Sequence, residues 1–325
     1  MDRIAVVIPC FRVRSHILNV LSRIGPEVSL VVVVDDACPE HSGELVRATT
    51  KDPRVKVVCH AHNQGVGGAV LTGYEYAAER DFDVIVKIDG DGQMDPALIP
   101  RFAAPIIAGT ADYTKGNRFY NPRNVASMPM ARIFGNATLS FMNKASSGYW
   151  SIFDPTNGFT AISARLIDEL PLDKIANRYF FESDMLFRLG TLRAVVLDIP
   201  MAAIYADEKS GLNIWGSVAD FLRGHSINAF KRVFYNYYLR GFSAASIELL
   251  AGGLALLFGV LFGGYHWLLS ITSGIPASTG TVMVAALPVI VGFQLLISFL
   301  NYDIASSPRT AIHPLMNRPD CRLSQ

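Results

Sequence analysis

The sequence DVIVKIDGD, residues 83–91, joins an apolar run to two carboxylates. Residues 84–88 have the length and composition of a buried strand, and Asp89 and Asp91 follow where it ends. Side chains two residues apart on a strand point the same way, roughly 6–7 Å apart. Hard oxygens in this position suit a divalent cation that also takes phosphate oxygens. An acidic turn built on Gly90 is the alternative interpretation.

Strands and helices alternate along the first part of the chain. Apolar runs predict strands at residues 4–8, 28–34, 55–58 and 84–88. Helical spacing or a glycine-rich entry predicts helices at residues 14–24, 43–50 and 65–78. This alternation indicates an α/β fold with a mostly parallel sheet. A helix at residues 128–146 and a strand at 194–199 are expected further on.

The composition narrows the class of protein. Among 325 residues, 29 Lys and Arg nearly balance 28 Asp and Glu, which gives no support for nucleic-acid binding. The four cysteines form no CxxC pair and no zinc-like cluster, and the three that lie in or beside strand-like runs are expected to be reduced and structural. No signal peptide is visible before the first strand, and the N-terminal part is therefore expected in the cytosol.

Two long stretches near the C-terminus predict a membrane hairpin. Residues 249–270 and 280–300 contain no Asp, Glu, Lys or Arg, and each is long enough to span a bilayer as a helix. Basic residues flank the pair, whereas the link at 271–279 has none. The positive-inside tendency places the catalytic part and both termini in the cytosol, in a multi-pass protein of the inner (plasma) membrane. A buried helical hairpin in a soluble fold is the alternative.

Residues 214–242 mix aromatic rings with arginine and lysine, a composition that favours the membrane interface. We interpret them as helices on the cytosolic surface; an amphipathic packing helix is the competing interpretation. The predicted division of the chain is a catalytic domain at 1–212, interfacial helices at 213–244, a transmembrane hairpin at 245–302 and a cytosolic tail at 303–325. Paired glycines in the first span permit close helix contacts, so a homo-oligomer is possible.

Polar motifs follow the predicted strands, where open α/β sheets bind ligands. Their order and spacing resemble a family 2 glycosyltransferase of the polyprenyl-phosphate type, which includes dolichyl-phosphate mannose synthase. The resemblance runs from residue 4 to about residue 240. It implies a nucleotide-sugar-binding, Rossmann-like domain with a C-terminal membrane anchor. The motifs are Pro9 to Arg12, Asp35-Asp36, Asn63 to Ala69, Asp89 to Gln93 and Asp154 to Phe159, with Glu182-Ser183-Asp184 further on.

The resemblance assigns the earlier motifs to the donor and the metal. It implies that Pro9, Asp35 and Asp36 contact the base and ribose, and that the loop carrying Asn63 and Gly67 packs near the nucleotide. A helix N-cap is the alternative for the two aspartates, and helix-entry geometry for the glycines. Asp89 and Asp91 would hold Mg²⁺ or Mn²⁺ against the donor diphosphate, and Gln93 would assist by hydrogen bonding.

The later motifs are assigned to phosphates and acceptor. The resemblance places Arg118 near the donor phosphates and Arg132 near the acceptor phosphate, for which a guanidinium is well shaped. Lys209 and Ser210 would grip donor or lipid phosphate. Surface salt bridges or solvated positions are the alternatives. Asp154, then Asp184, then Glu182 are the candidates for orienting the acceptor, with helix caps or ion pairs as the alternative for the last two.

The resulting hypothesis is a metal-dependent, inverting glycosyltransferase that moves one sugar from a nucleotide diphosphate to a polyprenyl phosphate. Arg12 and Arg14 depart from the family pattern, which leaves the donor base open. The motif Gln-x-x-Arg-Trp of processive synthases is absent, which favours single-sugar transfer. The rivals are a glycosyltransferase for a glycan or protein acceptor, a degenerate membrane scaffold, and a nucleotidyltransferase, whose basic glycine-rich motif is missing near the N-terminus.

Overall fold

The computed structural model describes residues 3–120, 130–202 and 214–316. The chain forms two compact units. Unit 1 comprises residues 1–229 together with residues 308–325, and unit 2 comprises residues 230–307. The chain therefore leaves unit 1 once, forms unit 2, and returns.

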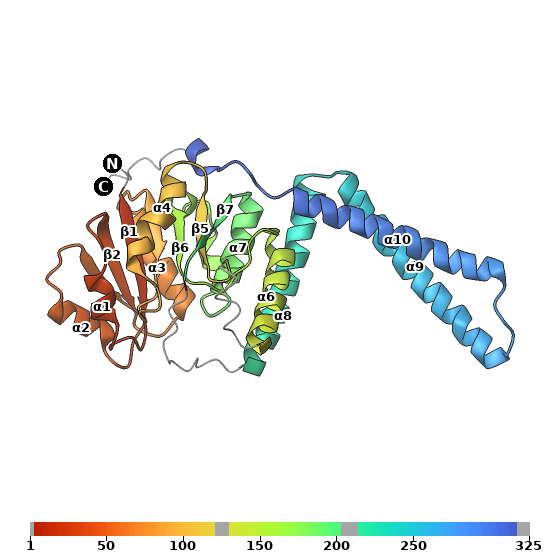
Figure 1. Cartoon of the computed structure of the whole chain (residues 1–325), viewed down its shortest axis with the longest axis horizontal. Helices are drawn as coiled ribbons and strands as arrows, with labels where there is room; N and C mark the ends of the chain where they lie inside the picture. Colours follow the sequence, from red (N-terminus) through yellow and green to blue (C-terminus); the bar gives the residue numbers. More distant parts are fainter. Residues whose placement is uncertain (1–2, 121–129, 203–213, 317–325) are drawn as a thin grey trace. The chain divides into compact units, whose positions relative to one another are not determined.

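Unit 1 is built on a seven-stranded sheet with the order β3-β2-β1-β4-β6-β5-β7 (Figure 1). The pairs β1–β2, β1–β4, β2–β3 and β5–β7 are parallel, while β6 is antiparallel to β4 and to β5. The predicted α/β fold with a mostly parallel sheet is confirmed. The strands are β1 (Ile4–Cys10), β2 (Val28–Asp35), β3 (Val55–Cys59), β4 (Val84–Lys87), β5 (Tyr113–Asn117), β6 (Thr160–Ser163) and β7 (Val196–Pro200).

Hydrophobic cores cover both faces of this sheet. Along β1, Ala5 and Val7 belong to one buried cluster, and Val6 and Ile8 belong to another. A strand buried on both faces has no polar alternation, which is why these runs are continuously apolar. The helices of unit 1 are α1 (Ile17–Ser22), α2 (Ser42–Thr49), α3 (Val66–Ala78), α4 (Ile99–Ile107), α6 (Met130–Ser147), α7 (Phe181–Leu192) and the first part of α8 (Ile214–Phe234).

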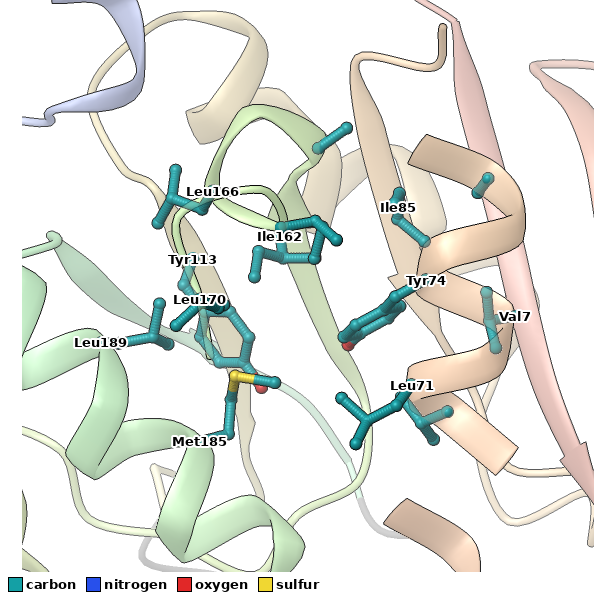
Figure 2. Packing of buried hydrophobic residues seen from close by; sticks show 14 of the residues in the cluster. Val7, Leu71, Tyr74, Ile85, Tyr113, Ile162, Leu166, Leu170, Met185 and Leu189 are labelled. Carbon is teal, nitrogen blue, oxygen red and sulfur yellow. The ribbon is translucent and has the colours of Figure 1, made fainter. Parts of the chain in front are cut away.

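Figure 2 shows the cluster between α3 and the sheet, where Leu71 and Tyr74 of α3 lie near Val7 and Ile85. Gly73 permits this approach, because a Cβ atom at that position would overlap the side chain of Val7. This glycine in the middle of α3 thus serves helix–sheet packing.

The strand β4 ends at Lys87, one residue earlier than the expected run at 84–88. Asp89 and Asp91 therefore lie in the turn that follows, and the strand geometry expected for them was wrong. Three elements of the site region were not predicted, namely β5, β6 and α7. The strand β5 carries the sequence YTKGN, which has no apolar pattern that marks a strand.

Unit 2 contains α9 (Ala244–Ser273) and α10 (Thr279–Ala305), and the π-helical turn η4 (Tyr235–Arg240) precedes them. Gly252 lies against Gly292, and Gly259 lies against Ala285, so the helices are antiparallel neighbours (Figure 1). Both helices are long and apolar enough to cross a membrane, and they contain the predicted spans. Only 22% and 6% of their most apolar windows is buried, which opposes the interpretation of a hairpin buried in a soluble fold.

The segment after α10 returns to unit 1 through Asp112. This fully buried carboxylate accepts hydrogen bonds from the backbone N–H groups of Val195, Ile312 and His313 at 2.7, 2.9 and 2.8 Å. The Nδ1 atom of His313 lies 2.8 Å from it as well. Burial by itself raises the pKa of Asp112, but these hydrogen bonds outweigh it and lower the pKa below its ordinary value. Both ends of unit 2 are consequently connected to unit 1.

Candidate functional site

The turn after β4 presents the two predicted metal carboxylates. Asp91 accepts a hydrogen bond from the backbone N–H of Gln93 at 2.9 Å, which shapes the turn. Asp89 lies 3.0 Å from the Nζ atom of Lys87, and 29% of its side chain is exposed. The glycine between them adds no side chain to the turn. Both carboxylates thus follow the carboxyl end of a central strand, where this sheet class binds ligands.

Lys87 is a site residue that the sequence reasoning missed. Its side chain is 1% exposed, and its ammonium group lies 3.0 Å from Asp89 and 3.1 Å from Glu182. Burial favours neutral lysine, but the two carboxylates outweigh it and raise the pKa of Lys87. A lysine inside an otherwise apolar strand was the available signal, because lysine is almost never fully buried without a partner.

A row of polar residues crosses four strands below this turn. Lys87 on β4 pairs with Thr160 on β6, Thr160 pairs with Lys115 on β5, and Lys115 pairs with Asp198 on β7. Residues paired side by side in a sheet project from the same face. A row of polar side chains therefore lies beside the site and extends across these four strands.

Two members of this row have pKa values displaced by burial. Desolvation lowers the pKa of Lys115 to about 8, although Glu182 and Asp154 oppose it, and its Nζ atom donates to the carbonyl of Asn157. Desolvation raises the pKa of Asp198 to about 6. Asp198 accepts from the amide of Asn117 at 2.8 Å. Displaced values of this kind cluster at functional sites.

The loop of residues 154–158, predicted to face the acceptor, lies against the turn that carries Asp89 and Asp91, which is called the metal turn below. Asp154 is buried and binds Arg118 through two hydrogen bonds, at 2.8 and 2.9 Å. A Cβ atom at Gly158 would touch both the ammonium of Lys87 and the carboxylate of Asp89. The structure thus brings together Asp89, Arg118, Asp154 and Glu182, which lie in four separate motifs.

Asp35 and Asp36 have extensive protein contacts. Asp35, the last residue of β2, accepts from the N–H groups of Cys38 and Gly43 at 2.7 and 2.6 Å, whereas the N-cap position of α2 is His41. Asp36 accepts from the N–H groups of Gln64 and Gly65 at 2.8 and 2.7 Å, and contacts His60 at 2.8 Å. Their contact with the donor stays a prediction.

The other predicted donor residues lie beside these aspartates. Asn63 donates to the carbonyl of Asp36 at 3.2 Å. Pro9 lies on β1 and pairs with Val34. A Cβ atom at Gly67 would meet the backbone of residues 176–177, so the glycine-rich loop packs closely against the segment before α7. These contacts hold the loop in place, and its contact with a nucleotide stays a prediction.

The two acidic residues of the later motif, Glu182 and Asp184, lie in different environments. Glu182 belongs to the Lys87 cluster, whereas Asp184 is buried and accepts from the N–H of Ala176 at 2.9 Å and from Asn228 on α8 at 2.8 Å. Asp184 therefore fastens helices, and its predicted catalytic role stays a prediction. Arg132 lies on α6, with its side chain outside the described part, and Lys209 and Ser210 lie outside the described residues.

The residues at the turn fit a divalent cation shared with a diphosphate. Asp89 and Asp91 supply hard oxygens, and the described residues contain no cluster of three His, Cys, Asp or Glu side chains able to hold a metal. Mg²⁺ is usually bound through one or two carboxylates together with substrate phosphates and water. The donor set therefore matches a cation that arrives with a phosphate ligand.

Residues 5–170 match the family model Glycosyl transferase family 2, which covers more than half of the chain. The chain belongs to glycosyl transferase family 2. As a member of this family it is an enzyme, and its relatives fit that class. The dolichyl-phosphate N-acetylglucosaminyltransferase of Methanococcus voltae, which uses UDP-N-acetylglucosamine by name, is 27% identical over 63% of this chain and 86% of the relative.

Other relatives of this glycosyltransferase have similar names. The undecaprenyl-phosphate mannosyltransferase of Micrococcus luteus is 29% identical over 62% of this chain and 84% of its own. Among solved structures, glucosyl-3-phosphoglycerate synthase of Mycobacterium tuberculosis superposes with a TM-score of 0.54 at 18% identity, over 71% of this chain and 80% of that one. This structural likeness shows the shared fold.

Proposed function

We propose that this glycosyltransferase transfers one sugar from a nucleotide-diphosphate sugar to a polyprenyl phosphate at the cytosolic face of the membrane, with inversion and with a divalent metal. The observation that carries the proposal is the loop of residues 154–158: its Asp154 binds Arg118 and its Gly158 lies against Asp89, in a chain that also has an apolar helical hairpin. Relatives named for dolichyl or undecaprenyl phosphate support this acceptor class.

The chemistry follows from the charges at the site. When bound at Asp89 and Asp91, Mg²⁺ or Mn²⁺ would neutralise negative charge on the departing nucleoside diphosphate. Arg118, held in one orientation by Asp154, directs a planar cation toward phosphate oxygens. A phosphate acceptor is already an anion, so it needs orientation more than deprotonation. Its oxygen attacks the anomeric carbon while the bond to the diphosphate breaks, which inverts that carbon.

The membrane part of the proposal rests on unit 2. Large apolar side chains such as Leu261 and Ile290 are exposed on α9 and α10, as expected of helices that face lipid. Exposed aromatic residues precede them, including Phe230 and Phe242. The chain enters the hairpin from unit 1 and returns to unit 1 after it, so both flanks of the hairpin continue into the catalytic unit.

The test is transfer by purified protein from each radiolabelled nucleotide sugar to undecaprenyl phosphate, dolichyl phosphate, a glycan or a protein. The expected product is a labelled lipid that disappears in excess chelator and in the Asp91→Ala variant. Undiminished transfer in chelator would contradict the metal, and labelling of glycan or protein alone would contradict the acceptor.

A further inference from the structure

Lys87 places an ammonium group against one of the two carboxylates that fit the metal. Its Nζ atom lies 3.0 Å from Asp89 and 3.1 Å from Glu182, and its side chain is 1% exposed. The ammonium therefore lies within ion-pair distance of both carboxylates and is almost closed off from solvent. One carboxylate of the metal-binding pair is thus partly neutralised by a fixed internal cation, which it shares with Glu182.

The packing around the ammonium confines it. A Cβ atom at Gly158 would touch the Nζ atom of Lys87 and a carboxylate oxygen of Asp89, so the loop lies directly over the pair. The strand β4 holds the base of the side chain, and all four of its residues are buried. The ammonium therefore has little room to leave Asp89 when a metal approaches, and two cations must share that carboxylate.

Two cations close together repel each other strongly in a partly buried site. Without a donor, the metal would meet Asp91 and an Asp89 that already pairs with an ammonium group, and the described residues offer no cluster of three acidic, histidine or cysteine ligands. A diphosphate brings additional negative charge and hard oxygens, which offset the repulsion. The electrostatics thus oppose binding of the metal alone and favour binding of the metal together with a diphosphate.

We propose that Lys87 is an internal counter-ion that makes metal binding at Asp89 and Asp91 depend on the diphosphate of the donor. This inference rests on the proposed function, which identifies the metal pair. Lys87 is a positioning residue: it holds Asp89 in place before the donor arrives, joins the metal turn to Glu182, and suppresses occupation of the site by a cation alone.

The test measures Mn²⁺ binding by electron paramagnetic resonance on full-length protein in detergent, with Mn²⁺ alone and with UDP or GDP added. In the Lys87→Met variant, affinity for Mn²⁺ alone rises about tenfold or more, because a unit charge next to the ion is removed. The gain in affinity from the nucleotide becomes smaller. The Lys87→Arg variant retains the charge, and it retains the dependence on the nucleotide.

A second variant acts in the opposite direction. Glu182→Gln leaves the ammonium to Asp89 alone, so affinity for Mn²⁺ alone falls below that of the wild type. Lys56→Met is the control: it removes an exposed lysine from β3, which β2 and β1 separate from β4. Its Mn²⁺ affinity changes by less than about threefold.

Melting temperatures in chelator identify any variant that does not fold. If Lys87→Met does not fold, the Mn²⁺ affinity of Glu182→Gln tests the inference. The inference is overturned if folded Lys87→Met binds Mn²⁺ alone no more tightly than wild type, or if Glu182→Gln binds it equally or more tightly. These measurements need neither acceptor nor turnover. A protein that transfers no sugar but shows both shifts would refute the proposed function and leave the counter-ion role standing.

Discussion

Arg118 and Asp154 form a two-pronged ion pair, with Nε at 2.8 Å from Oδ2 and Nη2 at 2.9 Å from Oδ1. The carboxylate is 1% exposed and the guanidinium side chain is 24% exposed. A buried anion is thus balanced by a cation that reaches the edge of the site. The pair joins the residue that follows β5 to the loop that covers Asp89.

Removing Arg118 should therefore damage stability as well as transfer. Arg118→Met leaves Asp154 buried without its main partner, which costs about 3–5 kcal/mol. The double variant Arg118→Met with Asp154→Asn should recover most of the melting temperature, because the buried charge is gone. Its transfer rate should stay about 100-fold or more below wild type. A double variant with wild-type transfer would show that the pair is only structural.

Gly158 should tolerate no side chain. Gly158→Ala places a methyl group against Lys87 and Asp89, so the metal turn must shift. Transfer should fall about 100-fold, since small displacements at a reacting centre have effects of this size. Gly135→Ala on α6 is the control, because a Cβ atom there meets nothing within 4 Å. Equal activity of the two variants would contradict the close approach of the loop.

Asp198 should make stability fall between pH 4 and pH 6. Burial raises its pKa to about 6, so in this window the folded state binds a proton that the unfolded state has released. The stabilisation from the protonated carboxyl group is complete below the pKa that Asp198 has in the unfolded state, and it is lost as the pH rises through about 6. Melting temperatures of Asp198→Asn should rise relative to wild type from pH 4 to pH 6 and then level. A constant difference at all pH values would contradict the shift.

The segment after α10 should be held by His313. His313→Ala removes the side-chain contact with Asp112 at 2.8 Å, so residues 311–316 should detach more often. Exposed Arg309 just before them should then be cleaved faster by trypsin. Gel bands of the full-length protein over time measure the rate, and His41→Ala, at an exposed histidine, is the control. Equal cleavage of the two variants would contradict a role for this contact.

The stability of the unit 2 hairpin should depend on whether a substituted glycine faces the neighbouring helix. Gly292→Leu forces a Cβ atom to 2.7 Å from the backbone nitrogen of Leu256, which cannot move aside easily. Gly253→Leu meets nothing within 4 Å. Heating in detergent should aggregate the first variant at a clearly lower temperature than the second. The reverse order would show that the helices pack through another face.

Much of the scaffold was predictable from local pattern. Strands buried on both faces must be continuously apolar, which marked β1, β2 and β4, and helices exposed to lipid must be apolar over about twenty residues. The motifs at Asp89 and Asp154 were visible for the same reason, since polar groups stand out after such runs. The strand β5 was missed because its lysine and glycine resemble a loop until Asn157 and its neighbouring strands surround them.

The sequence by itself determined the strands, the apolar spans and the order of the motifs, because burial and lipid exposure act on residues that are close along the chain. Only the tertiary structure decided which charges meet. Lys87 and Glu182 are 95 residues apart, and Arg118 and Asp154 are 36 apart. Arg118 and Asp154 become partners because β6 pairs with β5, and Lys87 meets Glu182 because α7 returns to β4; no local pattern encodes either arrangement.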